Sequence, residues 1–509
     1  MLRGAKGHNR HVSQRKSYLF VLFALVLLAG CLPIPDMRVD LNLPAATYRF
    51  APERVRSEYV SVPGFALPDS PERYNKALYM RYFSPRSGEP TDTVLVLVPG
   101  IFGGATSVDI VARQLVASQP GLEVWAVDRR ANLLEERSAS VASLRTGDPS
   151  IAYDYYVKNL GKEEGFKPVP AEEVPFLAFW GLDVHLRDLH ELVRRAEGVA
   201  DNVILGGHSL GASMAALYAA YDFGTDEVPD IGDDHLDGLL LIDGTLGRTG
   251  AFSREGGLSV GPIELVPDVT RLEAGLGNPY FTLAFAPYTY ARSEAKVLLA
   301  RFAPDDLAPE KLFDYPITNY AAAGLAIDDR YEFSPAFGAS VGEPVGATFN
   351  GNLIAFLSEG AKGARSRSVA GVAPGYDAVR WERGDPSQER TDLDTLLQSQ
   401  VNEDTNFNEW YFPIRLLLDM ARLDLSLSDE PGFIPNSEVT TPTLAVGAER
   451  GLVASLDGFS AYNNARASVF FSAYVLRGLT HVDIVTAEDN PMVPLFGRWL
   501  GQVVEERTP

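Results

Sequence analysis

The sequence predicts an α/β protein in which a mostly parallel sheet is covered by helices on both faces. Apolar runs of strand length alternate with helical patterns from about residue 56 to the end of the chain, which is typical of βαβ units. The run Thr93–Val98 is almost wholly apolar, as expected for a central strand that is buried on both faces. The alternation stops after Ile242 and resumes at Thr443, so the sheet is expected to contain a long insertion.

The individual elements follow from hydrophobic periodicity. Strands are expected at residues 57–62, 77–83, 93–98, 122–127, 203–205, 239–242, 443–446 and 469–476. Helices are expected at 107–117, 182–196, 210–221 and 494–506. Eight strands with intervening helices form the expected core, in two parts covering residues 56–245 and 441–509.

The interval between the sixth and seventh strands is too long for a simple loop, so residues 246–440 are expected to form an inserted subdomain. We expect it to be mainly helical, with helices at 290–302 and 409–423, and to act as a cap or lid. Residues 360–400 are rich in Gly, Ser, Arg and Asp, and are expected to be irregular.

Composition excludes several classes of protein. The chain has 509 residues, of which 46% are apolar and 22% are charged, which is typical of a globular protein. The net charge of −22 disfavours nucleic-acid binding, because a surface this acidic repels phosphate groups. A single cysteine excludes an internal disulfide.

The amino terminus has the pattern of an export signal. Residues 1–30 combine a basic start with an apolar run that is too short to span a bilayer, and the run ends in Leu28-Ala29-Gly30-Cys31. This ending resembles a bacterial lipobox, which implies cleavage before Cys31 and lipidation of its sulfur, with residues 31–55 as a tether. An ordinary signal peptide that happens to end in cysteine is the alternative. With a lipid anchor the protein is expected at a membrane of the bacterial cell envelope, and Leu32 favours the outer membrane of a Gram-negative host.

The segment Gly207-His208-Ser209-Leu210-Gly211 lies between a buried strand and a helix of small residues. In this G-x-S-x-G pattern the glycines allow a sharp turn that exposes the serine above the sheet. Ser209 is therefore the candidate nucleophile. Leu210, the next residue, is expected to supply one backbone amide of an oxyanion hole.

A serine nucleophile needs a base, and elimination among the seven histidines leaves His481. It follows the last strand, whereas His208 is expected to point away from the serine. The acid that orients the base is expected to be Glu449, after the seventh strand, with Asp243 after the sixth strand as the alternative and Asp457 third. Asp483 is expected to fix the histidine loop.

The turn Val98–Gly104 is rich in glycine and follows the first central strand. Such a turn can direct a backbone amide toward the substrate, and Ile101 is the expected second oxyanion donor, followed by Phe102.

Together these residues resemble the α/β-hydrolase superfamily, and more narrowly its lipase and esterase branch. The resemblance rests on Val98–Gly104, Val127-Asp128-Arg129-Arg130, Gly207–Gly211 and Gly478–Asp483. The chain departs from the common pattern in having Pro99 where many relatives have histidine, in lacking a G-x-x-D after the seventh strand, and in the length of the insertion. The resemblance implies hydrolysis of a carboxylic ester through a seryl acyl-enzyme, with no cofactor and no metal.

The sequence therefore predicts a membrane-anchored serine hydrolase for hydrophobic esters. Activity as a peptidase, thioesterase or amidase is the alternative within enzymes, and a non-catalytic envelope binding protein is the alternative outside them. Aromatic residues of the insertion are expected either to line an acyl pocket or to form its core; they are Phe281, Phe285, Tyr288, Tyr290, Trp410 and Phe412.

Overall fold

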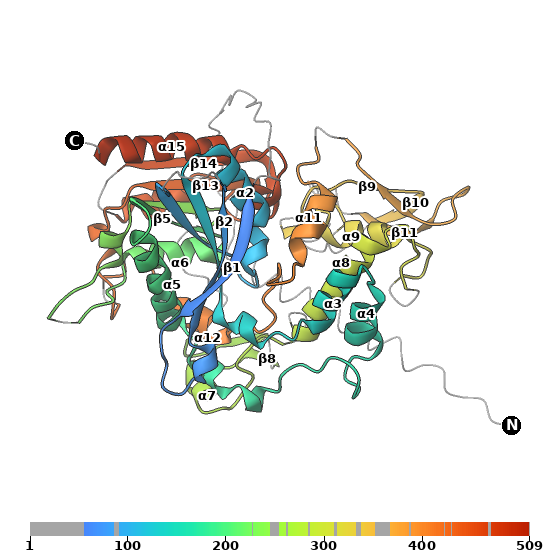
Figure 1. The fold of residues 1–509 in the computed structure, drawn as a ribbon, viewed down its shortest axis with the longest axis horizontal. Coiled ribbons are helices and arrows are strands. Elements are labelled where there is room, and N and C mark those ends of the chain that lie inside the picture. Colours follow the sequence, from blue (N-terminus) through green and yellow to red (C-terminus); the bar gives the residue numbers. More distant parts are fainter. Residues whose placement is uncertain are drawn as a thin grey trace.

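The chain folds around one eight-stranded sheet (Figure 1). The computed structural model describes residues 55–507, apart from 86–90, 226, 245–253, 261–262, 283–285, 310–312, 332–336, 352–366, 386–387, 422, 429 and 467–469. In sheet order the strands are β1 (Arg56–Pro63), β2 (Lys76–Phe83), β4 (Leu122–Asp128), β3 (Thr93–Val98), β5 (Asn202–His208), β6 (Gly238–Ile242), β13 (Thr443–Arg450) and β14 (Phe471–Thr480). All eight strands expected from the sequence are confirmed to within a few residues.

The sheet is mostly parallel, as predicted. β1 and β2 are antiparallel to their neighbours, and the pairs from β4 through β3, β5, β6 and β13 to β14 are all parallel. The carboxyl ends of these parallel strands therefore meet at one edge of the sheet. Residues that directly follow β3, β5, β6 and β14 are thereby brought together from distant parts of the sequence.

Helices cover both faces of the sheet. On one face α2 (Asp109–Ser118) and α15 (Met492–Arg507) pack together against side chains such as Leu95 and Leu444. On the other face lie α5 (Leu182–Glu197) and α6 (Leu210–Ala219), whose apolar side chains pack against Val96 and Leu205. β3 is fully buried between these two layers, which explains its lack of polar alternation.

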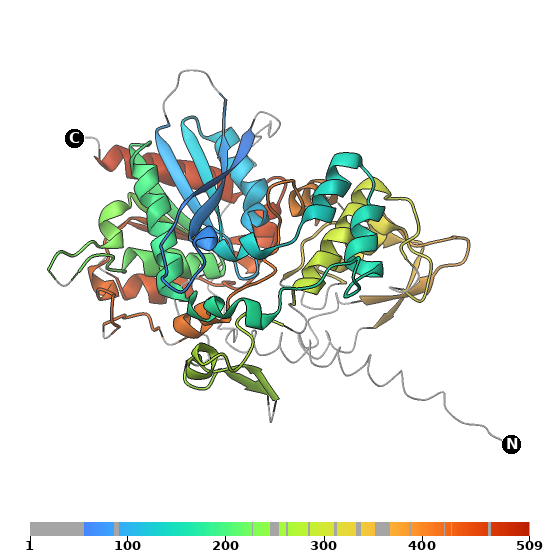
Figure 2. The ribbon, with the colours of Figure 1, turned by 60° about the horizontal axis from the view of Figure 1, so that its bottom comes forward.

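A second lobe lies beside the sheet (Figure 2). It contains α8 (Pro287–Phe302), α9 (Asn319–Ile327) and α11 (Leu393–Gln400) from the segment between β6 and β13. Two helices from before β5, α3 (Ser138–Thr146) and α4 (Ser150–Tyr153), pack against α8. Two separate segments of the chain therefore build this lobe. The earlier segment, which contains α3 and α4, was expected from the sequence to belong to the core.

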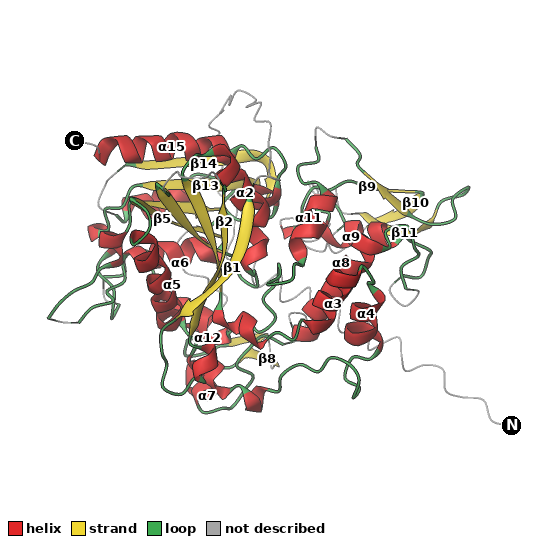
Figure 3. Cartoon of the chain, viewed as in Figure 1, coloured by secondary structure: helices red, strands yellow, loops and turns green. Residues whose placement is uncertain are grey.

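Where it is described, the long segment between β6 and β13 also contains short strands and further α-helices (Figure 3). The paired strands are β7 (Leu258–Val260) with β8 (Ile263–Val266), β9 (Glu343–Val345) with β12 (Arg380–Glu382), and β10 (Ala347–Gly351) with β11 (Arg367–Val372). The helices are α7 (Val269–Glu273) and α12 (Ile414–Met420). The described residues among 360–400, expected to be irregular, thus include β11, β12 and α11.

The helix expected at 409–423 begins only at Ile414. Pro413 precedes it, and a residue before proline is driven toward extended backbone. The backbone before Ile414 has partners of its own, because the amide of Glu409 donates to the Phe102 carbonyl and the amide of Trp410 donates to Glu135. Residues 409–412 therefore form a buried, non-helical segment, with a turn at Trp410 and Tyr411, instead of a first helical turn.

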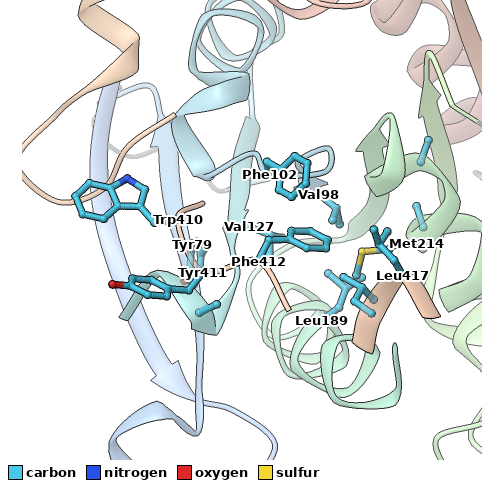
Figure 4. Close-up of a cluster of buried hydrophobic side chains, with 14 of the residues drawn as sticks. Tyr79, Val98, Phe102, Val127, Leu189, Met214, Trp410, Tyr411, Phe412 and Leu417 are labelled. Atoms are coloured by element: carbon cyan, nitrogen blue, oxygen red, sulfur yellow. The ribbon is translucent and has the colours of Figure 1, made fainter. Parts of the chain in front are cut away.

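This 409–412 segment joins the insertion to the sheet (Figure 4). Phe412 lies among Val98, Phe102 and Val127 from the ends of β3 and β4, with Leu417 and Met214 nearby, and all belong to one continuous apolar cluster. The insertion and the sheet consequently share a core.

Residues 1–54, including Cys31, lie outside the described part of the chain. Among the residues that are described, no helix combines the length and the apolar character needed to cross a membrane.

Candidate active site

Ser209 occupies a sharp turn between β5 and α6. Its backbone has φ 58° and ψ −120°, a conformation that residues other than glycine adopt only under strain. A Cβ on Gly207 would lie 2.0 Å from the backbone of Gly211, and one on Gly211 would lie 2.1 Å from the Val98 carbonyl oxygen. Both glycines of the motif are therefore needed for the close approach of strand, turn and helix.

A buried histidine–aspartate pair lies at the same sheet edge. Asp243 follows β6 and His481 follows β14, and Asp243 Oδ2 lies 2.6 Å from His481 Nδ1. Asp243 has no exposed surface, and His481 is 4% exposed. Because the carboxylate occupies Nδ1, the Nε2 atom of His481 is left to act as a base.

Asp243 is held by the loop after β13. Its Oδ1 accepts hydrogen bonds from the amides of Ala448 and Val453, and its Oδ2 accepts one from Leu452. Burial alone would raise the pKa of Asp243, but the hydrogen bonds and charge of His481, together with the amides, outweigh burial and hold this pKa below its usual value. A Cβ on Gly451 would lie 2.1 Å from Asp243 Oδ2, so only glycine fits there.

The acid expected first, Glu449, is not paired with His481. Its carboxylate is exposed and accepts a hydrogen bond from the amide of Gly478, which has φ 72°. The loop after the seventh strand thus contributes backbone amides around Asp243 in place of the acid itself. Asp457 begins helix α13 (Asp457–Asn464), where it pairs with Ser455. The geometry accordingly favours the alternative, Asp243.

Ser209 lies beside this pair. Its amide donates to the carbonyl of Ile242, the residue before Asp243, and a Cβ on Gly244 would lie 2.2 Å from the Ser209 carbonyl oxygen. The ring of His208 lies against that of His481, with centroids 4.3 Å apart. The nucleophile turn and the histidine loop are therefore in direct contact.

His208 has a structural role that the sequence did not reveal. Its Nε2 lies 2.9 Å from the carbonyl oxygen of His481, and since a carbonyl only accepts, Nε2 must carry the proton. Burial, with a smaller contribution from the charge of His481, lowers the pKa of His208 to about 3. His208 is therefore a neutral donor that holds the histidine loop.

The glycine-rich turn after β3 also reaches this edge. A Cβ on Gly100 would lie 3.1 Å from Ser209 Cβ. The amide of Gly103 donates to the Gly100 carbonyl, which closes a turn with Ile101 and Phe102 in the middle. Phe102 has φ 57°, so the turn is strained at this residue.

Arg129, which follows β4, fixes the direction of this turn. Its guanidinium donates to the carbonyls of Pro99, Gly100 and Gly103 at 3.2, 2.8 and 2.9 Å. In a trans peptide the C=O and the following N–H point in opposite directions. Because the Gly100 carbonyl faces Arg129, the Ile101 amide faces away from it, as required of an oxyanion donor.

Residues 405–409 of the insertion complete the support of the turn. Glu409 forms a buried ion pair with Arg129, with Glu409 Oε2 2.7 Å from Arg129 Nε, and the Gly104 amide donates to the carbonyl of Phe407. Thr405 Oγ1 donates to Asp128 Oδ2, while Asp128 Oδ1 accepts from the Ala105 amide. The oxyanion turn is therefore held between β4 and the insertion.

The insertion contacts the histidine loop as well. Asp483 accepts hydrogen bonds from the Ser340 amide and hydroxyl and from Thr391 Oγ1, and Thr480 Oγ1 donates to the Gly338 carbonyl. The ring of Phe337 lies edge-on to His481, with centroids 5.2 Å apart.

The aromatic residues of the insertion fall into two groups. Phe281 and Phe412 pack edge-on against Phe102, with centroids 5.2 and 5.1 Å away, and Tyr290 lies 6.2 Å from it. Trp410 packs instead against Tyr156 and Phe166, away from the turn. Tyr288 is 37% exposed, and Phe285 lies outside the described residues.

Comparisons with known proteins find similarity only among solved structures. No family model matches the chain, and no curated protein matches its sequence. A candidate lipase from Sulfolobus solfataricus aligns over 90% of this chain and 98% of its own, with 16% identity and a TM-score of 0.47. An esterase from Thermogutta terrifontis aligns over 88% and 99% (12% identity, TM-score 0.35), and an epoxide hydrolase from Vigna radiata over 89% and 99% (12% identity, TM-score 0.40).

The supporting roles of three residues were not apparent from the sequence: Arg129, Glu409 and His208. Arg129 stood in a segment already singled out, directly after a buried strand, and an arginine in that place is a sign of a buried carbonyl or carboxylate partner. Glu409 gave no comparable sign, because its partner lies 280 residues away in the sequence.

Proposed function

We propose that this protein is a serine hydrolase that cleaves carboxylic esters. Ser209 Oγ attacks the ester carbonyl as its proton passes to His481 Nε2, and His481 then returns a proton to the leaving alcohol. Water repeats these steps on the acyl-enzyme and releases the acid. Asp243 holds Nδ1–H of His481 and stabilises the imidazolium that forms transiently.

The observation that carries this proposal is the strained turn at Ser209 beside a buried His481–Asp243 pair. A positive φ at a residue other than glycine persists only where the surroundings enforce it, and here two glycines that cannot be substituted enforce it. The Asp243 carboxylate accepts hydrogen bonds from three backbone amides and pairs with His481 Nδ1, so the orientation of the His481 ring is fixed. The combination supports nucleophilic catalysis.

The Ile101 and Leu210 amides form the proposed oxyanion hole. Leu210 is the first residue of α6, where a backbone amide has no partner within the helix and the helix dipole favours negative charge. Each well-placed donor contributes about 3–4 kcal/mol to the transition state of acyl transfer.

We infer that the substrate has an apolar acyl part. Phe102, Phe281 and Phe412 place an aromatic cluster directly beside the oxyanion turn. Ser209 is only 6% exposed and Phe337 of the insertion lies on His481, so part of the insertion must move to admit a substrate. The insertion therefore acts as a lid in this proposal.

We further propose that the protein is anchored at the cell envelope through lipidated Cys31. In cells, globomycin should block cleavage of the signal, and labelled palmitate should appear on the wild type but not on Cys31→Ala. Unchanged processing together with an unlabelled wild type contradicts the anchor.

The central test is chemical labelling together with a series of p-nitrophenyl esters of increasing chain length. The wild type should react with a fluorophosphonate and hydrolyse at least one ester, whereas Ser209→Ala should do neither and should keep the wild-type circular dichroism spectrum. Labelling without ester turnover would indicate that the enzyme cleaves amides, peptides or thioesters instead of esters. Absence of labelling in the folded wild type would leave only a binding function.

A further inference from the structure

A second cluster of ionisable side chains lies at the opposite end of the sheet from Ser209. It comprises His190 on α5, Asp230 in the loop after α6, and His235 in the short 3-10 helix Gly232–His235, just before β6. One ligand atom from each residue lies within 4.8 Å of the other two. His190 Nε2 is 3.4 Å from Asp230 Oδ2, and His235 Nε2 is 2.6 Å from Asp230 Oδ1.

Outer partners orient both imidazoles toward Asp230. His190 Nδ1 lies 2.9 Å from the Tyr218 hydroxyl, and His235 Nδ1 lies 3.0 Å from Glu197 Oε1. Without an ion, His235 Nε2 donates to Asp230 Oδ1. A bound cation would replace that proton, and Nδ1–H of each ring could then be donated outward to Tyr218 or Glu197. Histidines that bind metals are commonly oriented in this way by a carboxylate or another oxygen on the far nitrogen.

The positions of the rings are also fixed by packing. His190 stacks on Phe223, with ring centroids 4.0 Å apart and an angle of 14° between the rings. The loop that carries Asp230 is held by Asp222, whose carboxylate accepts from the amides of Gly224 and Asp230. Little reorganisation is therefore needed to bring the three ligands to one ion.

The charge state of the cluster suits a cation. Asp230 brings a carboxylate to the centre of the cluster, and the carboxylate of Glu197 lies behind His235. Among the described residues, Arg194 is the cationic side chain in contact with the cluster, at 3.1 Å from His235 Nδ1, and it is paired with Glu197 at 2.7 Å.

We propose that His190, Asp230 and His235 form a zinc-binding site that is separate from the proposed catalytic centre. Zinc takes imidazole nitrogens and carboxylate oxygens at about 2.0–2.2 Å in a tetrahedral arrangement, with water able to fill a fourth position. Tetrahedral bonds of that length place ligand atoms about 3.3 Å apart. The 3.4 Å between His190 Nε2 and Asp230 Oδ2 is close to this separation, and the 2.6 Å between His235 Nε2 and Asp230 Oδ1 would have to widen by less than about 1 Å. The Asp230 side chain is 42% exposed, so an ion and a water molecule can enter from solvent.

The ion would connect α5, the loop around Asp230 and the segment leading into β6. Because the site lies at the opposite end of the sheet from Ser209, its effect should be on stability. An ion that binds only the folded chain raises the free energy of unfolding by an amount that grows with its concentration.

The test uses untagged full-length protein that has been treated with a chelator and then titrated with zinc chloride against a chromogenic competitor. We expect one tight equivalent of zinc and a higher melting temperature when it is bound. Asp230→Asn and His235→Ala should weaken binding by about 100-fold or more, and Glu197→Gln by about 10-fold, as for an outer partner. Asp234→Asn removes the same charge from an exposed neighbour and should bind like the wild type.

Cobalt in place of zinc gives a second readout, because tetrahedral coordination produces visible absorption that Asp230→Asn should lose and Asp234→Asn should keep. Failure of the wild type to bind zinc more tightly than about 100 μM, well short of structural zinc sites, overturns the proposal. Equal binding by Asp230→Asn and Asp234→Asn also overturns it, because zinc would then occupy another site such as His481. Should Asp230→Asn fail to fold without metal, an unchanged affinity in folded Glu197→Gln refutes the proposed orientation of His235.

Discussion

Substituting Arg129 with lysine should disable the oxyanion turn while conserving charge. The guanidinium makes three hydrogen bonds to turn carbonyls and one ion pair with Glu409, and all four partners surround one planar group that is buried beside the turn. A lysine ammonium has three donors on a single atom and cannot reach all four acceptors. At least one carbonyl, and with it the direction of the next amide, is then released.

The expected loss of activity follows from displacement of the Ile101 amide. Loss of the Ile101 donor would remove about 3–4 kcal/mol of transition-state stabilisation, a decrease in kcat of roughly 10²- to 10³-fold. KM for a p-nitrophenyl ester should change little, because the amide contacts an oxyanion that exists only in the transition state. The rate of fluorophosphonate labelling should fall in parallel with kcat.

The matched control is Arg145→Lys. Arg145 of α3 forms an ion pair with Glu403, which belongs to the same insertion as Glu409. Both side chains are at least half exposed, and such pairs contribute at most about 1 kcal/mol to stability. Its kcat should equal that of the wild type. If Arg129→Lys is folded, as judged by circular dichroism, and keeps kcat within about threefold of the wild type, the turn does not depend on Arg129 and the reasoning is wrong.

Four further outcomes are expected. Asp243→Asn should lower kcat by about 10⁴-fold, whereas Glu449→Gln should leave kcat unchanged in the same ester assay. The reverse result would identify Glu449, the acid first expected from the sequence, as the partner of His481. Gly451→Ala should lower kcat at a near-wild-type KM, because the new Cβ would meet Asp243 Oδ2 at 2.1 Å; full activity would mean that the loop adjusts freely. Gly501→Ala, in α15 with open space around it, should raise the free energy of unfolding by about 1 kcal/mol in urea titrations, and a loss of stability would contradict the open environment. Burial lowers the pKa of His185 to about 3, so below about pH 6.5 the unfolded chain binds a proton at this residue and the folded chain does not. The free energy of unfolding therefore decreases as the pH is lowered, and His185→Gln should reduce this decrease by about 1.4 kcal/mol between pH 7.5 and 5.5. An unchanged pH dependence would show that His185 is not buried as a neutral group.

The sheet and the serine turn were predictable because their signals are local. Six consecutive residues specify β3, and five residues around Ser209 carry both the turn and its glycines. His481 followed from the position of the last strand. These inferences need only hydrophobic period and chain order.

The identity of the acid was not predictable in the same way. Asp243 directly follows β6 and Glu449 lies near the end of β13, at the same sheet edge, so sequence order permits either. The choice depends on which loop folds around which carboxylate, and Gly451 decides this through a contact across about 200 residues of sequence. The non-helical backbone at 409–412 was not predictable for a similar reason, since its partner Phe102 lies in another part of the chain.

The insertion has a consequence for how the chain acquires its structure. β6 is buried along its whole length and must pair with β13, which is not synthesised until about 200 residues later, or roughly 10–40 s at ordinary rates of translation. Until then its free edge is an apolar template for pairing with other chains. Fragments that stop before residue 443 should consequently aggregate, and the nascent protein should depend on chaperones or on export in an unfolded state during this interval.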